Sequence, residues 1–297
     1  MTDGSVRRLF AYPFRIFFLS AAVLAALVVP WWTAAVTGAV PVAMLPAWHA
    51  HEMLYGFLAA AIAGFLLTAV CRWTDSDPVS GVPLLGLYAL WLLPRLAAAG
   101  APPLLSQLAE LAFLPLVILA AARPIVRVRQ WRQLPLLAAL ALFCCCDLAF
   151  HASGDPRWLH GGLLLGALLV VLVGSRITPA FSRNWLRQRG GEAADVADPG
   201  WLAWPLYAVF LLLLAGEAWI ILGAAGPPAA LTAVVSLAGA GQLLLAALAL
   251  RVAAALGLPG WEPTVIASAL TWFMAFALYL WYYSSVLMNP RPDGRPG

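Results

Sequence analysis

The segment WHAHEMLYGF (Trp48–Phe57) holds two of the four histidines of the chain, His49 and His51, beside Glu52 and Met53. A neutral imidazole is a common ligand of haem iron and of copper. The thioether sulfur of a methionine is a soft donor that suits Cu(I). The segment therefore predicts metal ligands or proton-handling groups near the start of a long apolar run.

Helical spacing limits what these side chains can do together. On a helix, His49 and His51 point about 200° apart, so they serve one metal only where the backbone is extended. On a helix His51 and Tyr55, at i and i+4, lie one turn apart. His49 and Glu52, at i and i+3, also lie on the same face, about one turn apart. The chain contains no HExxH motif, so the sequence gives no support to a zinc hydrolase.

A second pair of polar residues, Asp147 and His151, is spaced i, i+4. On a helix this spacing lets the Asp147 carboxylate bind the His151 imidazole and orient it as a metal ligand. The remaining polar candidates inside apolar segments are His160, Glu110 and Glu217.

A simpler interpretation stays open for several of these residues. Polar side chains near helix ends reach the membrane interface at little cost, so His49, His151 and His160 can also be ordinary residues at the rim. Arg95 and Glu110 are better explained as an ion pair across a short outer loop than as catalytic groups.

Composition places all of these residues in a membrane. The chain has 297 residues, of which 63% are hydrophobic and only 10% are charged, whereas soluble domains are typically about 25% charged. The net charge of +4 is explained by arginines in cytoplasmic loops, so nucleic-acid binding is not expected. The composition predicts an all-α polytopic transmembrane bundle that forms a single domain over residues 1–297 and contacts the lipid bilayer.

Apolar runs of spanning length predict about nine transmembrane helices. Pro94 and Pro115 are expected to kink their helices, and Pro179 is expected to end the sixth in a cytoplasmic turn, RITPAFSRNWL. The first helix is expected to be retained rather than cleaved. The predicted helices are Ile16–Trp32, Glu52–Val70, Val82–Ala99, Leu104–Ala122, Leu134–His151, Leu159–Ile177, Leu202–Leu222, Leu231–Leu256 and Thr264–Leu287.

Arginine placement predicts the orientation. Arginines precede the first predicted helix and crowd the loop Arg123–Arg132, so the positive-inside rule places that loop and the N-terminus in the cytoplasm. The segment Leu186–Gly200 is then a polar cytoplasmic linker. With alternating helices, every histidine and every intramembrane carboxylate falls in the outer half of the membrane. Because buried ionisable groups cost about 2.5–3.5 kcal/mol each, this shared depth predicts one shared site.

Several motifs resemble the NnrS family of bacterial membrane proteins. They are YPFRIFFLSAA (Tyr12–Ala22), WHAHEMLYGF with the following AIAGFLLTAV and RWT, GSRITPAFSRNWL (Gly174–Leu186), and TWFMAF with the terminal NPRPDGRPG. The resemblance implies a protein of the inner membrane that contains haem and copper and acts in the nitric-oxide response or denitrification. Family members usually have about twelve helices, and two late motifs, HLGYAW and HALTVGAxGTM, are not found here. The chain thus resembles an internally shortened member.

Three functions follow as hypotheses. The first is a protein that binds haem or copper, with one imidazole from His49 or His51 and another from His151 or His160. The second is a transporter of a small ion, metal or metabolite through a polar pocket that faces the periplasm. The third is a redox-inactive remnant that binds protein partners, and homo-oligomers are possible for each. No residue pattern identifies a nucleophile or a general base, so no enzymatic turnover is predicted.

Overall fold

A computed structural model describes part of the chain, and all of its regular elements are helices. The chain divides into two compact units, which are described separately. Unit 1 comprises Met1–Leu134 with Ala240–Gly297, and unit 2 comprises Pro135–Gly239. The residues described are 7–41, 46–99, 102–188, 250 and 261–288.

Helix α2 begins at Pro13, a proline in the first helical turn, where its missing N–H leaves no hydrogen bond unmade. Unit 1 contains α2 (Pro13–Val36), α3 (Pro46–His51), the π-helix η1 (Glu52–Leu58), α4 (Ala59–Thr74), α5 (Gly81–Leu92), the 3₁₀ helix η2 (Leu93–Ala99), α6 (Pro103–Arg127), η3 (Trp131–Gln133) and α12 (Trp261–Met288). Unit 2 contains α8 (Arg157–Gln188) and all of α7 (Leu134–Ser153) except its first residue, which ends the first segment of unit 1.

The predicted all-α membrane bundle is confirmed for the described residues. Six helices there are long and apolar enough to cross a bilayer, and each overlaps a predicted helix. The predicted helix Val82–Ala99 forms as a shorter α-helix, α5, that tightens into η2. The predicted helix Leu202–Leu222 lies outside the described residues, as does Leu231–Leu256 apart from Leu250.

Small residues let α2 and α4 pack closely. Ala21 and Ala25 of α2 and Ala63 of α4 are at most 2% exposed. A Cβ atom on Gly64 would lie 3.0 Å from the Cβ of Phe17, so a larger residue at this crossing would press against α2. Close backbone approach of this kind is how helices associate in lipid, where burying apolar surface gives no driving force.

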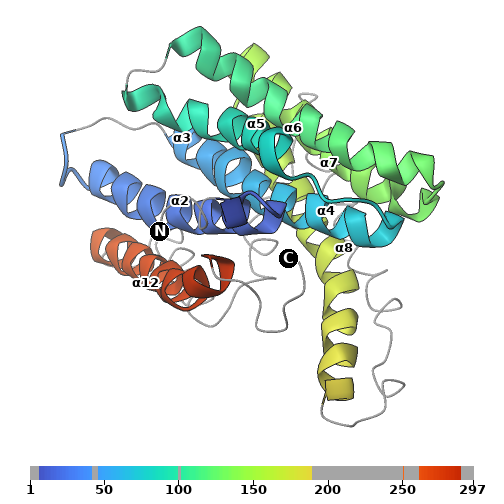
Figure 1. Ribbon diagram of the computed structural model, residues 1–297. Helices are drawn as coiled ribbons and strands as arrows, with labels where there is room; N and C mark the ends of the chain where they lie inside the picture. Colours follow the sequence, from blue (N-terminus) through green and yellow to red (C-terminus); the bar gives the residue numbers. More distant parts are fainter. Residues whose placement is uncertain (1–6, 42–45, 100–101, 189–249, 251–260, 289–297) are drawn as a thin grey trace. The chain divides into compact units, whose positions relative to one another are not determined.

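Helix α12 packs along α2, far away in the sequence (Figure 1). The Trp272 indole N–H donates to the carbonyl of Ala25 at 3.1 Å. At the other end of α12, Nη1 of Arg15 donates to the carbonyl of Leu287 at 2.6 Å. A guanidinium there satisfies a carbonyl that the last helical turn leaves without an intrahelical partner.

One expectation about a proline needs correction. Pro179 was expected to end the sixth helix in a turn, but α8 continues through it to Gln188. Pro115 lies inside α6 and does not end that helix, in line with the expectation, and Pro94 lies in η2. A proline removes one backbone hydrogen bond, and transmembrane helices tolerate that loss where neighbouring groups satisfy the freed carbonyl. The predicted linker Leu186–Gly200 therefore begins inside α8, and the rest of it lies outside the described residues.

Candidate functional site

The WHAHEMLYGF segment changes its helical geometry in the middle. Residues up to His51 form α3, and from Glu52 to Leu58 the backbone forms a π-helix before α4 begins. A π-helical turn is rare and is frequently found at functional sites. Sequence reasoning missed this change, and the only hint within the segment is Gly56.

Two buried carboxylates share one guanidinium beside this π-helix. Nε of Arg95, in η2, lies 3.1 Å from Oε2 of Glu52, and its Nη1 lies 2.9 Å from Oε2 of Glu110 in α6. The side chain of Arg95 is 7% exposed, that of Glu52 is 10% exposed and that of Glu110 is 6% exposed. We call these three residues the carboxylate–arginine cluster. The ion pair expected for Arg95 and Glu110 is present, and Glu52 is the partner that sequence reasoning missed.

The surroundings of Gly56 explain how the cluster closes. A Cβ atom on Gly56 would lie 2.6 Å from Oε2 of Glu52 and 3.1 Å from Nη2 of Arg95. The Trp91 indole N–H donates to the carbonyl of Gly56 at 2.9 Å. Arg95 in turn donates to the carbonyl of Trp91 at 2.8 Å and lies over its ring. Glycine at position 56 therefore makes room for the guanidinium.

His51 is buried at the edge of this cluster. Its Nδ1 lies 3.9 Å from Oε1 of Glu52, which is an electrostatic contact but too long for a hydrogen bond. Its ring centroid lies 5.1 Å from that of Tyr55, one turn further along. The cluster carries a formal charge of −1 when its three members are ionised, and this charge favours a cation beside the imidazole.

His49 has different neighbours from His51. Its ring stacks on Trp32 of α2, with centroids 4.3 Å apart and planes inclined by 16°. His49 and His51 thus lie in a helical segment and contact different groups, as helical spacing requires. Met53 follows in η1 and is half-buried.

Unit 2 holds a second imidazole that is oriented by a carboxylate. Nδ1 of His151 lies 3.0 Å from the backbone carbonyl oxygen of Asp147 and 3.3 Å from its Oδ1. Helix α7 positions both residues, one turn apart, and Asp147 is only 3% exposed. The i, i+4 spacing thus brings the carboxylate to the imidazole.

The remaining predicted site residues lie elsewhere. His160 is exposed near the start of α8. Glu217 lies outside the described residues. Because His49 and His51 belong to unit 1 whereas His151 and His160 belong to unit 2, the idea of one shared cavity stays a prediction.

Comparison with known proteins gives one match. The model of the family described as NnrS protein matches residues 8–244. No curated protein and no solved structure matches the chain. The family match covers the YPFRIFFLSAA, WHAHEMLYGF and GSRITPAFSRNWL motifs, whereas the C-terminal motifs lie beyond it. Because the match extends over most of its length, the chain belongs to the NnrS family.

Proposed function

We propose that the chain is a haem- or copper-binding protein of the bacterial inner membrane that acts in the nitric-oxide response or denitrification. Its N-terminus is cytoplasmic in this proposal. Family membership supports it, and so does the presence of a carboxylate beside an imidazole in each unit.

The observation that carries the proposal is the contact between Asp147 and His151. The carbonyl and the carboxylate of Asp147 both face Nδ1, and they match the tautomer of the imidazole that carries its proton on Nδ1 and its lone pair on Nε2. Histidines that bind metals almost always donate their second ring N–H to a carboxylate or a carbonyl in this way. The residues of α7 thus fit an imidazole-ligated metal group, and Nε2 of His151 is the proposed ligand atom.

In unit 1, His51 is the proposed ligand. Arg95 holds Glu52 in place, and Glu52 presents its other oxygen to the imidazole. The negative charge of the carboxylate–arginine cluster favours a metal cation there over an anion.

His49, Met53 and His160 remain further candidate ligands from the sequence, and Tyr55 and Glu217 remain supporting groups. A bound haem or copper would supply the affinity for nitric oxide.

An optical spectrum of the purified protein combined with metal analysis tests the proposal. Haem ligated by imidazole gives an intense Soret band, whereas copper without haem is found only by metal analysis. His151→Ala is expected to remove the group or shift its spectrum. Cys145→Ala is the matched control, since Cys145 is an exposed neighbour on the same helix. Protein that holds neither haem nor copper after supplementation with both refutes the proposal.

A second function, a transporter of a small ion, metal or metabolite, is favoured by the carboxylate–arginine cluster itself. Ionisable groups inside a membrane commonly mark ion or substrate pathways. Uptake of a metal ion into proteoliposomes that is lost in Glu110→Gln, with no metal retained by the purified protein, would favour this function over the first.

A further inference from the structure

A pocket of about 1020 Å³ lies in unit 1, between α5, α6 and the loop that follows α4. None of the members of the carboxylate–arginine cluster lines it. It reaches the end of α6 that carries Arg123 and Arg127, whereas Glu110 lies nearer the start of that helix. The pocket is therefore separate from the site described above.

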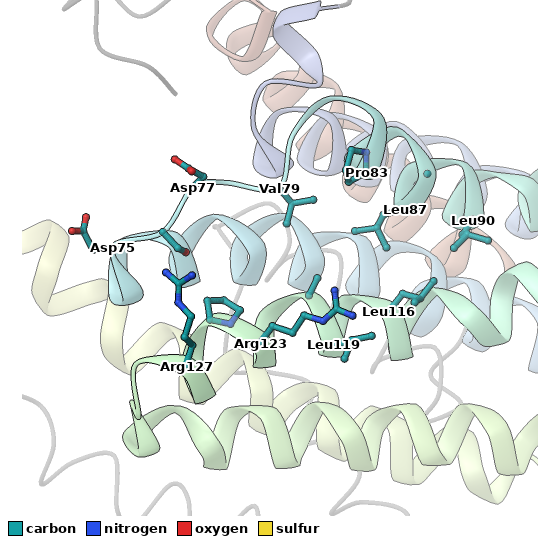
Figure 2. A pocket seen from close by; sticks show the side chains of 14 residues that line it. Asp75, Asp77, Val79, Pro83, Leu87, Leu90, Leu116, Leu119, Arg123 and Arg127 are labelled. Carbon is teal, nitrogen blue, oxygen red and sulfur yellow. The ribbon is translucent and has the colours of Figure 1, made fainter.

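One end of the pocket carries charges of both signs. Arg123 and Arg127 lie one turn apart on α6, and Asp75 and Asp77 lie in the loop after α4. All four side chains are exposed, and no ion pair joins them to another residue in the part of the chain that the structure describes. Figure 2 shows Arg127 extending from α6 toward this loop, whereas the Arg123 side chain, one turn earlier on α6, extends toward Leu119. Within the described residues, the pocket thus offers two cations and two anions that no ion pair neutralises.

The other end of the pocket is apolar. Leu116 and Leu119 of α6 lie on the same face as the two arginines, at helical spacing, and are 39% and 44% exposed. Leu87 and Leu90 of α5 line the opposite wall. Figure 2 shows these leucines toward one end and the aspartates toward the other. Because α6 is long and apolar enough to span a bilayer, the leucines lie at the depth of acyl chains.

We propose that this pocket binds a phospholipid whose headgroup carries both a phosphate and a primary ammonium. Arg123 and Arg127 hold the phosphate, because a guanidinium forms charge-assisted hydrogen bonds to phosphate oxygens. Asp75 and Asp77 accept hydrogen bonds from the ammonium, and an acyl chain covers the leucines. The pocket charges sum to zero, as do those of this headgroup, so charge complementarity selects it over a lipid with a net negative charge.

Native mass spectrometry of the purified chain tests the proposal with three lipids of identical acyl chains. The lipids are phosphatidylethanolamine, phosphatidylglycerol and phosphatidylcholine. Phosphatidylethanolamine is expected to bind most tightly, because the quaternary ammonium of phosphatidylcholine donates no hydrogen bond and phosphatidylglycerol has no cation. The variant Arg123→Gln with Arg127→Gln is expected to weaken binding about tenfold or more, because it removes both donors of charge-assisted hydrogen bonds to the phosphate. Asp75→Asn with Asp77→Asn is expected to abolish the preference over phosphatidylglycerol.

The matched control is Arg7→Gln with Arg129→Gln, which removes the same charge from exposed residues that do not line the pocket. Equal binding of the three lipids, or equal loss in the control and the Arg123/Arg127 variant, overturns the proposal. Displacement of the lipid by millimolar inorganic phosphate also overturns it and identifies a free phosphate as the ligand. A dimer that the Arg123/Arg127 variant dissociates would instead identify a second copy of the chain as the occupant. The thermal unfolding midpoint of each variant shows that it is folded.

Discussion

Arg95 donates a hydrogen bond to Glu52 at 3.1 Å, although 43 residues separate them in the sequence. The contact ties η2 to η1, the π-helical part of the WHAHEMLYGF segment. Glu110, bound to the same guanidinium, adds α6 to this connection. The carboxylate–arginine cluster therefore fixes three elements of unit 1 around His51.

Replacing Arg95 with glutamine is expected to destabilise unit 1 by about 3–5 kcal/mol, because it leaves two buried carboxylates without their cation. Equilibrium unfolding in detergent measures this loss. Glu52→Gln combined with Arg95→Gln is expected to cost less than Arg95→Gln alone, since one of the stranded charges is removed with its partner.

Arg157→Gln is the control for this prediction. Arg157, the first residue of α8, pairs at 2.6 Å with Asp155 in the preceding loop, where water screens the pair. No measurable change in the unfolding midpoint is expected. If the Arg95 and Arg157 variants have equal stability, the cluster does not hold unit 1 together.

Gly56→Ala is expected to open the carboxylate–arginine cluster, because the new methyl group would lie 2.6 Å from Oε2 of Glu52. The variant should lower both the unfolding midpoint and the occupancy of any metal at His51. Gly174→Ala is the matched control, since a Cβ atom there meets nothing within 4 Å. A Gly56 variant that behaves like the Gly174 variant would show that the backbone relaxes without cost.

Sequence patterns predicted the helices well and the contacts between them poorly. Apolar runs located α2, α6 and α12, because spanning a bilayer demands a minimum apolar length. The spacing of Asp147 and His151 predicted their contact, because a helix brings i and i+4 together. Local pattern of this kind is readable from a single sequence.

Other features depend on tertiary structure and were missed. The partnership of Glu52 with Arg95 joins distant segments, and no local spacing encodes it. The amino-acid composition of η1 does not distinguish a π-helix from an α-helix, since its residues suit both. Pro179 was interpreted as a helix end because proline usually breaks helices in water, but α8 continues through it.

Asp147→Asn is expected to weaken metal binding by about 10–100-fold without abolishing it, because asparagine keeps a hydrogen-bond acceptor but loses the charge behind His151. Metal titration followed by absorbance measures the affinity, and the position of the absorption bands reports the ligand environment. Asp147→Glu is expected to bind the metal more tightly than Asp147→Asn, because glutamate keeps the negative charge. An Asp147→Asn protein with unchanged affinity and spectrum would remove Asp147 from the site.

The positive-inside rule predicts that the arginine-rich connection from the end of α6 to the start of α7 is cytoplasmic and that the connection between α2 and α3 is periplasmic. Fusions of alkaline phosphatase after Val128 and after Val40 test both sides, because both residues follow the end of a helix. The enzyme is expected to be active only at Val40. Phosphatase activity at Val128 would place His49 and His51 on the cytoplasmic side and contradict the proposed orientation.

Arg15→Gln is expected to loosen α12, because the guanidinium of Arg15 satisfies the carbonyl of Leu287 in the last turn of that helix. Hydrogen bonds from charged donors contribute about 1.5–3 kcal/mol, and the loss should appear in equilibrium unfolding. Trp272→Phe removes the hydrogen bond to Ala25 in the middle of α12 and is expected to cost about 0.5–1.5 kcal/mol. Arg72→Gln is the control, since Arg72 is an exposed arginine at the end of α4. If Arg15→Gln and Arg72→Gln unfold at the same denaturant concentration, the contact with Leu287 does not hold α12 against α2.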